Sequence, residues 1–407
     1  MHDGTFAPTV TPRFSQKREA IIAAATEILN QRGVGGMTLA LVAERVGLIT
    51  TSVTYYFKKK DELAAACFDS GVERLLILVR AARREADVAE RVRRLLELYL
   101  QLLAQVATGA APAIPDFSDI RALPPESQGP AGAAYMRLFR GVRELFDAPD
   151  ALPLNRAQAT ARTLILIEQL HWAPAWLSRY DVHDYPRACQ RMCDVLINGL
   201  AVPGDEWRPA PLDLGEGAPP KSGRDAFLHA ATCLINQRGY RGASVALISA
   251  QLNVTKGSFY HHHNAKDDVV SACFDRSFAV VRRAQLAARG LEGDEWLKLS
   301  SAAAALVAFQ LSNAGPLLRT SALAALPEPI RVETIAQSAR LSDRFASMIS
   351  DGVAEGSLRP VDPFIAAQML GATLNAAADL PALLHGVDAG AVIQLYARPF
   401  FTGLTAS

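Results

Sequence analysis

Two stretches of the sequence, residues 13–60 and 221–266, concentrate hydroxyl, aromatic and basic side chains that could bind phosphate. The first holds eight Lys and Arg against three Asp and Glu, and the second holds six against one. Each stretch therefore carries a net charge of +5, whereas the whole chain carries +1. Clustered positive charge beside hydrogen-bond donors is the combination that binds the phosphates of nucleic acid. The chemistry of the two stretches favours a polyanionic partner.

No constellation of residues points to catalysis. The sequence has no Gly-x-Ser-x-Gly nucleophile turn and no Gly-rich phosphate loop. We therefore expect no catalytic residue, no cofactor and no enzymatic activity. The consecutive His261, His262 and His263 could suggest a metal, but neighbouring residues on a helix point about 100° apart and cannot share one ion unaided. We expect no metal site.

The cysteine pattern predicts a reducing compartment. The five cysteines are too few and too scattered for a disulfide-stapled secreted protein. Only Cys189 and Cys193 are close together. They could sense oxidants or a metal, but two small buried side chains on one helix face are the favoured interpretation. Because residues 1–14 lack the basic start and apolar core of a secretory signal, we expect a cytoplasmic protein.

The composition predicts several well-packed domains. The chain has 407 residues, of which half are hydrophobic, enough for two or three domains with buried cores. Residues 299–318 are uncharged and nearly long enough to span a membrane, but serines, Gln310, Asn313 and Pro316 interrupt them. We expect a buried helix there and no membrane association.

The chain repeats itself. Residues 30–33 (Asn-Gln-Arg-Gly) recur as residues 236–239, and residues 66–69 (Ala-Cys-Phe-Asp) recur as residues 272–275, both at a shift of 206 residues. Weaker echoes follow further along the chain, among them Gly-Leu at 199–200 and at 403–404. The repeat therefore spans nearly the whole chain, and two similar units in tandem describe it better than one large fold.

A linker separates the two copies. Residues 203–221 hold five prolines and three glycines, a composition that resists helix formation and is typical of a segment that packs little. The predicted organisation follows from this boundary and from the basic stretches. It comprises basic domains suited to nucleic acid at 13–60 and 222–266, further helical domains at 61–202 and 267–407, and the linker at 203–221.

The elements within each copy are predicted to be helices. Strand-like alternation is almost absent, so the expected fold class is all-α. Each basic stretch has the periodicity and end signals of three short helices, and the second and third form a helix-turn-helix, whose second helix can lie in the major groove of DNA. In the first copy the predicted helices are 16–32 before Gly33, 38–46 capped by Thr38, 50–57 capped by Thr50 or Thr51, and a long helix from Asp61.

Longer helices are predicted after each basic stretch. Pro-rich loops such as 111–130 interrupt them. The predicted spans are 91–107, 131–146, 155–180 and 184–201 in the first copy, with 361–385 and 389–405 closing the second.

Residues 254–267, Val-Thr-Lys-Gly-Ser-Phe-Tyr-His-His-His-Asn-Ala-Lys-Asp, resemble the signature of the tetracycline-repressor (TetR) family. In that family a short recognition helix ends in an aromatic and histidine cluster before a Lys-Asp/Glu pair. Residues 48–63 resemble the same signature less closely, and the remaining helices fit the family only by length, order and apolar character. The resemblance implies a DNA-binding transcriptional regulator, most often a repressor that a small apolar or aromatic effector releases from double-stranded DNA.

The resemblance also implies roles for individual residues. In the second half it assigns DNA contacts to Thr255, Lys256, Gly257, Ser258, Tyr260, His261 and Lys266, with Ser244 capping the preceding helix. In the first half it assigns them to Thr50, Thr51, Ser52, Thr54, Tyr55 and Lys60, with Thr38 as the matching cap.

Three positions depart from the family pattern. Thr54 stands where the family usually has tyrosine, Thr50 replaces a frequent lysine, and His263 replaces the phenylalanine found at Phe57. Tyr55, Tyr56 and the lysines at 58–60 could compensate, because phosphate contacts need donors and positive charge more than one residue type. The lysine run alone could equally be a solvated face. An alternative function is therefore a small-molecule sensor with one or both DNA-binding domains degenerate.

The effector site is expected in the first half, whose helices carry more aromatic side chains than those of the second. Apolar side chains with a few polar tips are the usual lining of a ligand site, and the same residues could equally form plain core. The candidates are Tyr99, Leu103, Tyr135, Phe139, Leu166, His171, Trp172 and Trp176.

The resemblance further implies that residues 61–202 and 267–407 are effector and dimerisation domains, which pair through the last two long helices of each unit. The linker is long enough for the two halves of one chain to pair with each other, so we expect an intramolecular pseudo-dimer on a quasi-palindromic operator. Its recognition helices would then lie about 34 Å apart, one turn of DNA. Pairing between two chains, a homodimer with four DNA-binding domains, is the alternative.

Overall fold

The computed structural model describes residues 12–149, 151, 153–215, 223–251 and 266–406. These residues form α-helices and short 3-10 helices, and within them no β-strand occurs beyond one isolated bridge between Ala201 and Leu358. The all-α fold class is therefore confirmed. Of the helices in these ranges, none combines the length and apolar character needed to cross a bilayer.

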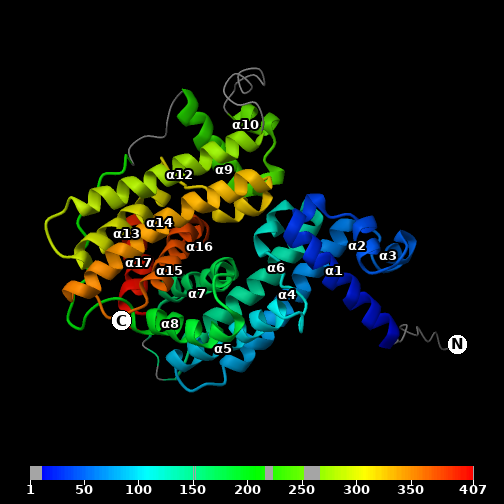
Figure 1. The fold of residues 1–407 in the computed structure, drawn as a ribbon, viewed down its shortest axis with the longest axis horizontal. Coiled ribbons are helices and arrows are strands. Elements are labelled where there is room, and N and C mark those ends of the chain that lie inside the picture. The colour runs from blue at the N-terminus through cyan, green and yellow to red at the C-terminus, as the bar shows by residue number, and fades with distance from the viewer. Residues whose placement is uncertain (1–11, 150, 152, 216–222, 252–265, 407) are drawn as a thin grey trace.

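The first unit begins with three helices at the right of Figure 1, α1 (Pro12–Gly36), α2 (Leu39–Arg45) and α3 (Thr50–Tyr56). Gly33 interrupts α1 with a φ of 63°, where the predicted helix ends. Thr38 caps α2, because its side chain accepts a hydrogen bond from the amide of Leu41 at 3.2 Å. The prediction that Thr50 or Thr51 caps α3 is wrong, since the N-cap is Ile49 and no side chain completes it.

Five longer helices complete the first unit: α4 (Lys60–Ala82), α5 (Val88–Ala107), α6 (Pro125–Arg143), α7 (Arg156–Leu177) and α8 (Tyr185–Asn198). Local signals set several of the starts. Asp87 caps α5 and Asn155 forms a capping box with Gln158 at the start of α7. Helix α6 begins inside the predicted Pro-rich loop, because proline fits the first turn of a helix. Three 3-10 helices connect these elements, η1 (Phe117–Ala122), η2 (Glu144–Phe146) and η3 (Val182–Asp184).

The second unit follows the same order. Its helices are α9 (Gly223–Gly242), α10 (Val245–Gln251), α12 (Lys266–Arg289), α13 (Glu295–Leu311), α14 (Glu328–Glu355), α15 (Pro363–Ala376), α16 (Leu380–Leu383) and α17 (Ala389–Thr402), with η4 (Thr320–Ala325) and η5 (Ala377–Asp379). Gly239 interrupts α9 with a φ of 71°, as Gly33 does α1. The uncharged stretch expected as a buried helix lies largely in α13, whose central residues are buried. The span predicted at 361–385 is divided into α15, η5 and α16.

The linker packs against the second unit, contrary to the expectation of a segment that packs little. Trp207 is only 9% exposed, and its ring lies 4.8 Å from that of Phe401 and 6.2 Å from that of Trp296. The hydroxyl of Ser301 accepts a hydrogen bond from the amide of Ala210 at 2.8 Å. Trp207 therefore anchors this part of the linker to α13 and α17, and Leu214 is buried in the same hydrophobic core.

The two units pack against each other through the helices that end each one. Helices α7 and α8 (green) contact α15 and α17 (orange to red) in Figure 1. Two backbone hydrogen bonds, both 2.7 Å long, join the C-terminal ends of the two units. The amide of Leu200 donates to the carbonyl of Phe401, and the amide of Leu404 donates to the carbonyl of Leu196. Side chains add polar contacts, such as Trp172 Nε1 donating to Gln368 Oε1 at 3.2 Å. Residues of both units therefore belong to one hydrophobic core, while α9, α10 and the first half of α12 contribute to a second cluster within the second unit.

Candidate nucleic-acid interface

Helix α3 packs against α2 and presents its outer face to solvent. Val53 of α3 and Phe57, which directly follows it, are buried in the core of the first unit. The opposite face of α3 carries Thr50, Thr51 and Tyr55, all exposed, with Tyr55 68% exposed. An exposed short helix with hydroxyl groups on its outer face can donate hydrogen bonds to phosphate or to base edges.

An aromatic cluster that the sequence did not suggest supports this face. Phe14, near the start of α1, lies 4.7 Å from the ring of Tyr56 and 6.1 Å from that of Tyr55. The two tyrosine rings are 5.3 Å apart, edge to face. Tyr56 is half-buried, so one tyrosine faces inward and the other outward. The cluster fixes the direction of the exposed Tyr55 ring. Its signal in the sequence was the apolar Phe14 ahead of the predicted first helix.

Other predicted contacts of the first unit already have partners within the protein. The hydroxyl of Thr54 donates to the carbonyl of Thr51 at 2.9 Å, and Ser52 is half-buried. Lys60 Nζ lies 3.4 Å from the carbonyl oxygens of both Val34 and Gly35. Lys60, the first residue of α4, thus contacts the end of α1. Lys58 and Lys59 beside it are exposed.

The second unit is described only in part at this site. Ser244 accepts a hydrogen bond from the amide of Leu247 at 3.2 Å, the same capping contact that Thr38 makes in the first unit. Lys266 lies at the start of α12 with its ammonium 4.1 Å from the centre of the Tyr240 ring. The other predicted contacts lie outside the described residues: Thr255, Lys256, Gly257, Ser258, Tyr260 and His261.

The predicted effector residues lie in the packed interior of the first unit and at its contact with the second. The hydroxyl of Tyr99 donates to the carbonyl of Leu170 at 2.6 Å, and burial raises the pKa of Tyr99 well above its usual range. Trp176 is buried with its ring 6.4 Å from that of Phe364 in the second unit. Phe139 and Leu166 are buried, whereas Leu103, Tyr135, His171 and Trp172 are half-buried.

A polar group accompanies these aromatic residues. The ring of His171 stacks on Tyr135 at 5.8 Å, and its Nδ1 lies 3.5 Å from Glu168 Oε1. Burial raises the pKa of Glu168, but the hydrogen bond and electrostatic attraction of His171, with the charges of Arg319 and Arg121, together outweigh it and keep that pKa below its usual value. Glu168 therefore stays ionised beside the aromatic cluster.

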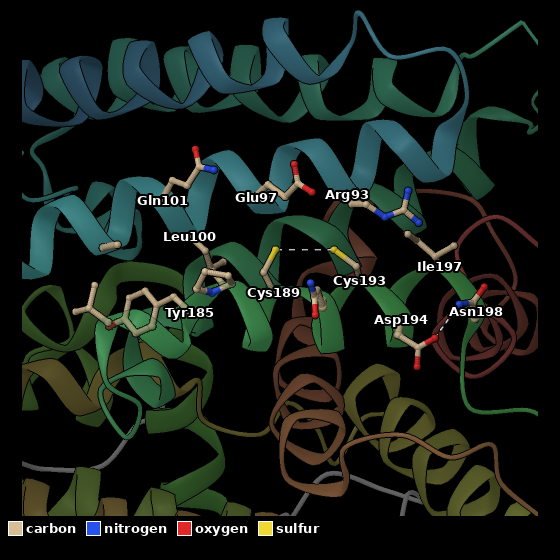
Figure 2. Close-up of a pocket in the computed structure, with 14 residues that line it drawn as sticks. Arg93, Glu97, Leu100, Gln101, Tyr185, Cys189, Cys193, Asp194, Ile197 and Asn198 are labelled. Carbon is tan, nitrogen blue, oxygen red and sulfur yellow. Dashed lines mark hydrogen bonds between the residues drawn. The ribbon is translucent and has the colours of Figure 1, made fainter.

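A cavity of about 600 Å³ lies elsewhere, between α5 and α8 (Figure 2). None of the eight predicted effector residues lines it. Its volume falls within the range of about 300–1,000 Å³ that is usual for ligand sites.

An ionic contact links the DNA-binding part of the second unit to the first unit. Arg121 of η1 donates to the carbonyl of Asn236 in α9 at 2.8 Å and to both oxygens of Asp379 at 3.2 Å. Asp379 of η5 also forms an ion pair with Arg319, whose amide donates to Asn236 Oδ1 at 3.1 Å. Helix α9 is therefore held by residues of both units.

The basic helical stretches match known proteins. The model of the family described as "Bacterial regulatory proteins, tetR family" matches residues 21–67 and 227–273. The Transposon Tn10 TetC protein of Escherichia coli is 34% identical over 61 residues, which cover 15% of this chain and 31% of that protein.

Solved structures show partial similarity. The TetR family transcriptional regulator PfmR from Thermus thermophilus has 21% identity and a TM-score of 0.38, covering 45% of this chain and all of that one. FadR from Bacillus subtilis, solved with stearoyl-CoA, has 16% identity and a TM-score of 0.33, covering 44% and 97%. With one match over each basic helical stretch, the chain carries two N-terminal domains of the tetR family of bacterial regulatory proteins in tandem.

Proposed function

We propose that this protein is a DNA-binding transcriptional regulator, a repressor that an apolar effector releases from a quasi-palindromic operator. One observation carries the proposal: one chain holds two family domains, and each of them overlaps a basic stretch. The exposed outer face of α3, with Thr50, Thr51 and Tyr55, supports DNA contact in the first unit. The apolar side chains around Tyr135 and His171 remain the proposed effector site.

The contacts of α7 and α8 with α15 and α17 support an intramolecular pseudo-dimer. Two similar DNA-binding domains held by one pairing surface match an operator with two half-sites, about one turn of DNA apart. Because the domains differ at matching positions, such as Tyr55 and His261, the two half-sites should differ in sequence. The operator is thus an imperfect inverted repeat.

The test is selection of genomic DNA fragments by the purified protein at two salt concentrations, with sequencing of the retained fraction. We expect an imperfect inverted repeat and an affinity that falls steeply with salt, since several Lys and Arg contacts release counterions. Sedimentation of the complex distinguishes one chain per operator from two. Retention without sequence preference would contradict the proposal and favour the alternative, a sensor whose DNA-binding domains are degenerate.

The contacts between units suggest how the two DNA-binding domains influence each other. Segment η1 of the first unit packs against α9 of the second, and η4 of the second packs against α1 of the first. Each DNA-binding domain therefore rests on the effector domain of the other unit as well as on its own. A change in the pairing of the units would move both domains together.

Replacing Arg121 by methionine tests this coupling. The variant loses the hydrogen bonds to Asn236 and Asp379 but keeps an unbranched side chain in place of the aliphatic part of arginine. Without them, α9 loses part of its fixed position, and operator affinity should fall about tenfold with no change in salt dependence, because Arg121 does not contact DNA. Fluorescence anisotropy with labelled operator measures both quantities.

The matched control is Arg83→Met, which removes an exposed ion pair with Glu144 inside the first unit. We expect it to bind the operator as the wild type does, since exposed ion pairs contribute little. Equal affinities for the Arg121 and Arg83 variants would argue against a coupling role for Arg121.

A further inference from the structure

Two thiols on α8 face the cavity between α5 and α8. Cys189 and Cys193 are one helical turn apart, and their Sγ atoms are separated by 4.0 Å. Both residues line the cavity, and Figure 2 shows the two sulphur atoms on the side of α8 that faces α5. Neither cysteine belongs to the proposed DNA-binding face or to the proposed effector residues.

The separation of the sulphur atoms allows both to bond to one soft atom. Two thiolates bound to a tetrahedral zinc ion lie about 3.8 Å apart, given a Zn–S bond of about 2.3 Å. A structural zinc site, however, needs two more ligands. In the part of the chain that the structure describes, the one group of three potential ligands is Asp181, His183 and Asp184, which includes neither cysteine. The pair therefore suits a ligand whose central atom bonds to two sulphur atoms and whose remaining bond is to an organic group of the ligand itself.

Protonation favours the same kind of ligand. The neighbouring Cys189 thiol, together with burial, raises the pKa of Cys193 far above its usual range. Both thiols are free of disulfide bonds. A ligand that condenses with protonated thiols therefore has an advantage over one that needs two thiolates already formed.

We propose that Cys189 and Cys193 form a dithiol site for organic compounds of trivalent arsenic, of the type R–As(OH)₂. In the binding step, two S–H bonds and two As–O bonds break and two As–S bonds form. The thiol protons leave with the hydroxyl groups as two water molecules. Arsenic stays trivalent and the sulphurs keep their oxidation state, so no oxidant or reductant is needed.

The cavity accommodates the organic substituent. Leu100 of α5 and Tyr185 and Ile197 of α8 line it, and their apolar surface suits an aryl group. Arg93 and Glu97 of α5 add polar groups to the lining of the same cavity. An aromatic arsenical should therefore bind more tightly than arsenite, which has no group to bury.

The experiment titrates the full-length protein, reduced with a phosphine in buffer free of small thiols, with phenylarsine oxide. Native mass spectrometry should show one phenylarsenic unit bound per chain in place of two thiol hydrogens. In the same complex, Cys189 and Cys193 should be protected from alkylation by iodoacetamide. Cys189→Ser and Cys193→Ser should each weaken binding by about 100-fold or more, because a single thiol loses the effective concentration of the second.

Cys233→Ser is the matched control. Cys233 is half-buried whereas the other four cysteines are buried, so its thiol is the one most accessible to a reagent that reacts without selectivity. It should bind phenylarsine oxide as the wild type does. Protection of cysteines other than 189 and 193 in the wild type, no bound equivalent, or wild-type affinity in either serine variant would overturn the proposal. The protection pattern is read in the wild type, so it remains decisive if a serine variant unfolds. No DNA is present, and the result is independent of the proposed regulatory function.

Discussion

Gly199→Ala should lower the free energy of unfolding by about 3 kcal/mol, because Gly199 lies where the ends of the two units meet. A Cβ atom at this position would lie 2.3 Å from the carbonyl oxygen of Phe401 and 2.5 Å from the amide nitrogen of Gly403. Both are backbone atoms, so relief requires the ends of α8 and α17 to move apart. The left-handed φ of 68° adds strain for any residue with a side chain.

The partner glycine predicts a reciprocal effect. A Cβ atom at Gly403 would lie 2.3 Å from the carbonyl oxygen of Ile197. Gly403→Ala should therefore destabilise the protein to a similar extent. The double variant should lose less than the sum of the two, because both substitutions disrupt the same contact. Urea denaturation followed by far-UV circular dichroism measures the three changes.

Gly47→Ala separates backbone strain from the clash. Gly47 has nearly the same φ, 67°, but a Cβ atom there would meet nothing within 4 Å. Only the cost of the left-handed conformation, about 1 kcal/mol, should appear. If Gly199→Ala lowers the free energy of unfolding no more than Gly47→Ala does, the close approach of α8 and α17 at Gly199 does not contribute to stability. Sedimentation of the Gly199 variant would further report whether the units separate.

The sequence predicted the helices of the first unit well because their signals are local. Thr38 and Gly47 bound α2 through a side-chain cap and a left-handed residue, and both act within a few residues. The N-cap of α3 was misassigned because Ile49 caps the helix with backbone geometry alone, and no particular residue type signals such a cap. The echo of Gly-Leu at 199–200 and 403–404 was visible, but its reason, a close approach of two backbones, needed the structure.

Long-range packing was harder to predict. The prolines and glycines of the linker are typical of a coil, yet the partners that bury Trp207 come from residues 296 and 401, far along the chain. The effector candidates are mostly aromatic side chains that carry one polar atom. A core residue whose polar atom is hydrogen-bonded within the protein has the same appearance in a sequence. Tyr99 is an example, since its hydroxyl is bonded to a backbone carbonyl. The cavity beside Cys189 arises from the spacing of two helices, which no local pattern encodes.

Tyr55→Glu should weaken operator binding on the order of 100-fold, because it sets a carboxylate on the proposed DNA face against phosphate. Stability should change little, since Tyr55 is 68% exposed and its aromatic contacts are with Phe14 and Tyr56 at the surface end of α3. Tyr55→Phe keeps the ring in that cluster and removes the hydroxyl alone. We expect it to lose about five- to tenfold, the contribution of one hydrogen bond. Anisotropy titrations with labelled operator measure both variants.

Ile77→Glu is the control for added negative charge. Ile77 is 60% exposed on α4, within the effector domain of the same unit, and the substitution changes the net charge by the same amount. If only Tyr55→Glu loses operator affinity, the loss comes from the position of the carboxylate on α3 and does not come from a long-range effect of the added negative charge. The matching substitution in the second unit, His261→Glu, completes the comparison. If His261→Glu weakens binding while Tyr55→Glu leaves it unchanged, the first domain does not read DNA, and the departures at Thr50 and Thr54 mark its loss.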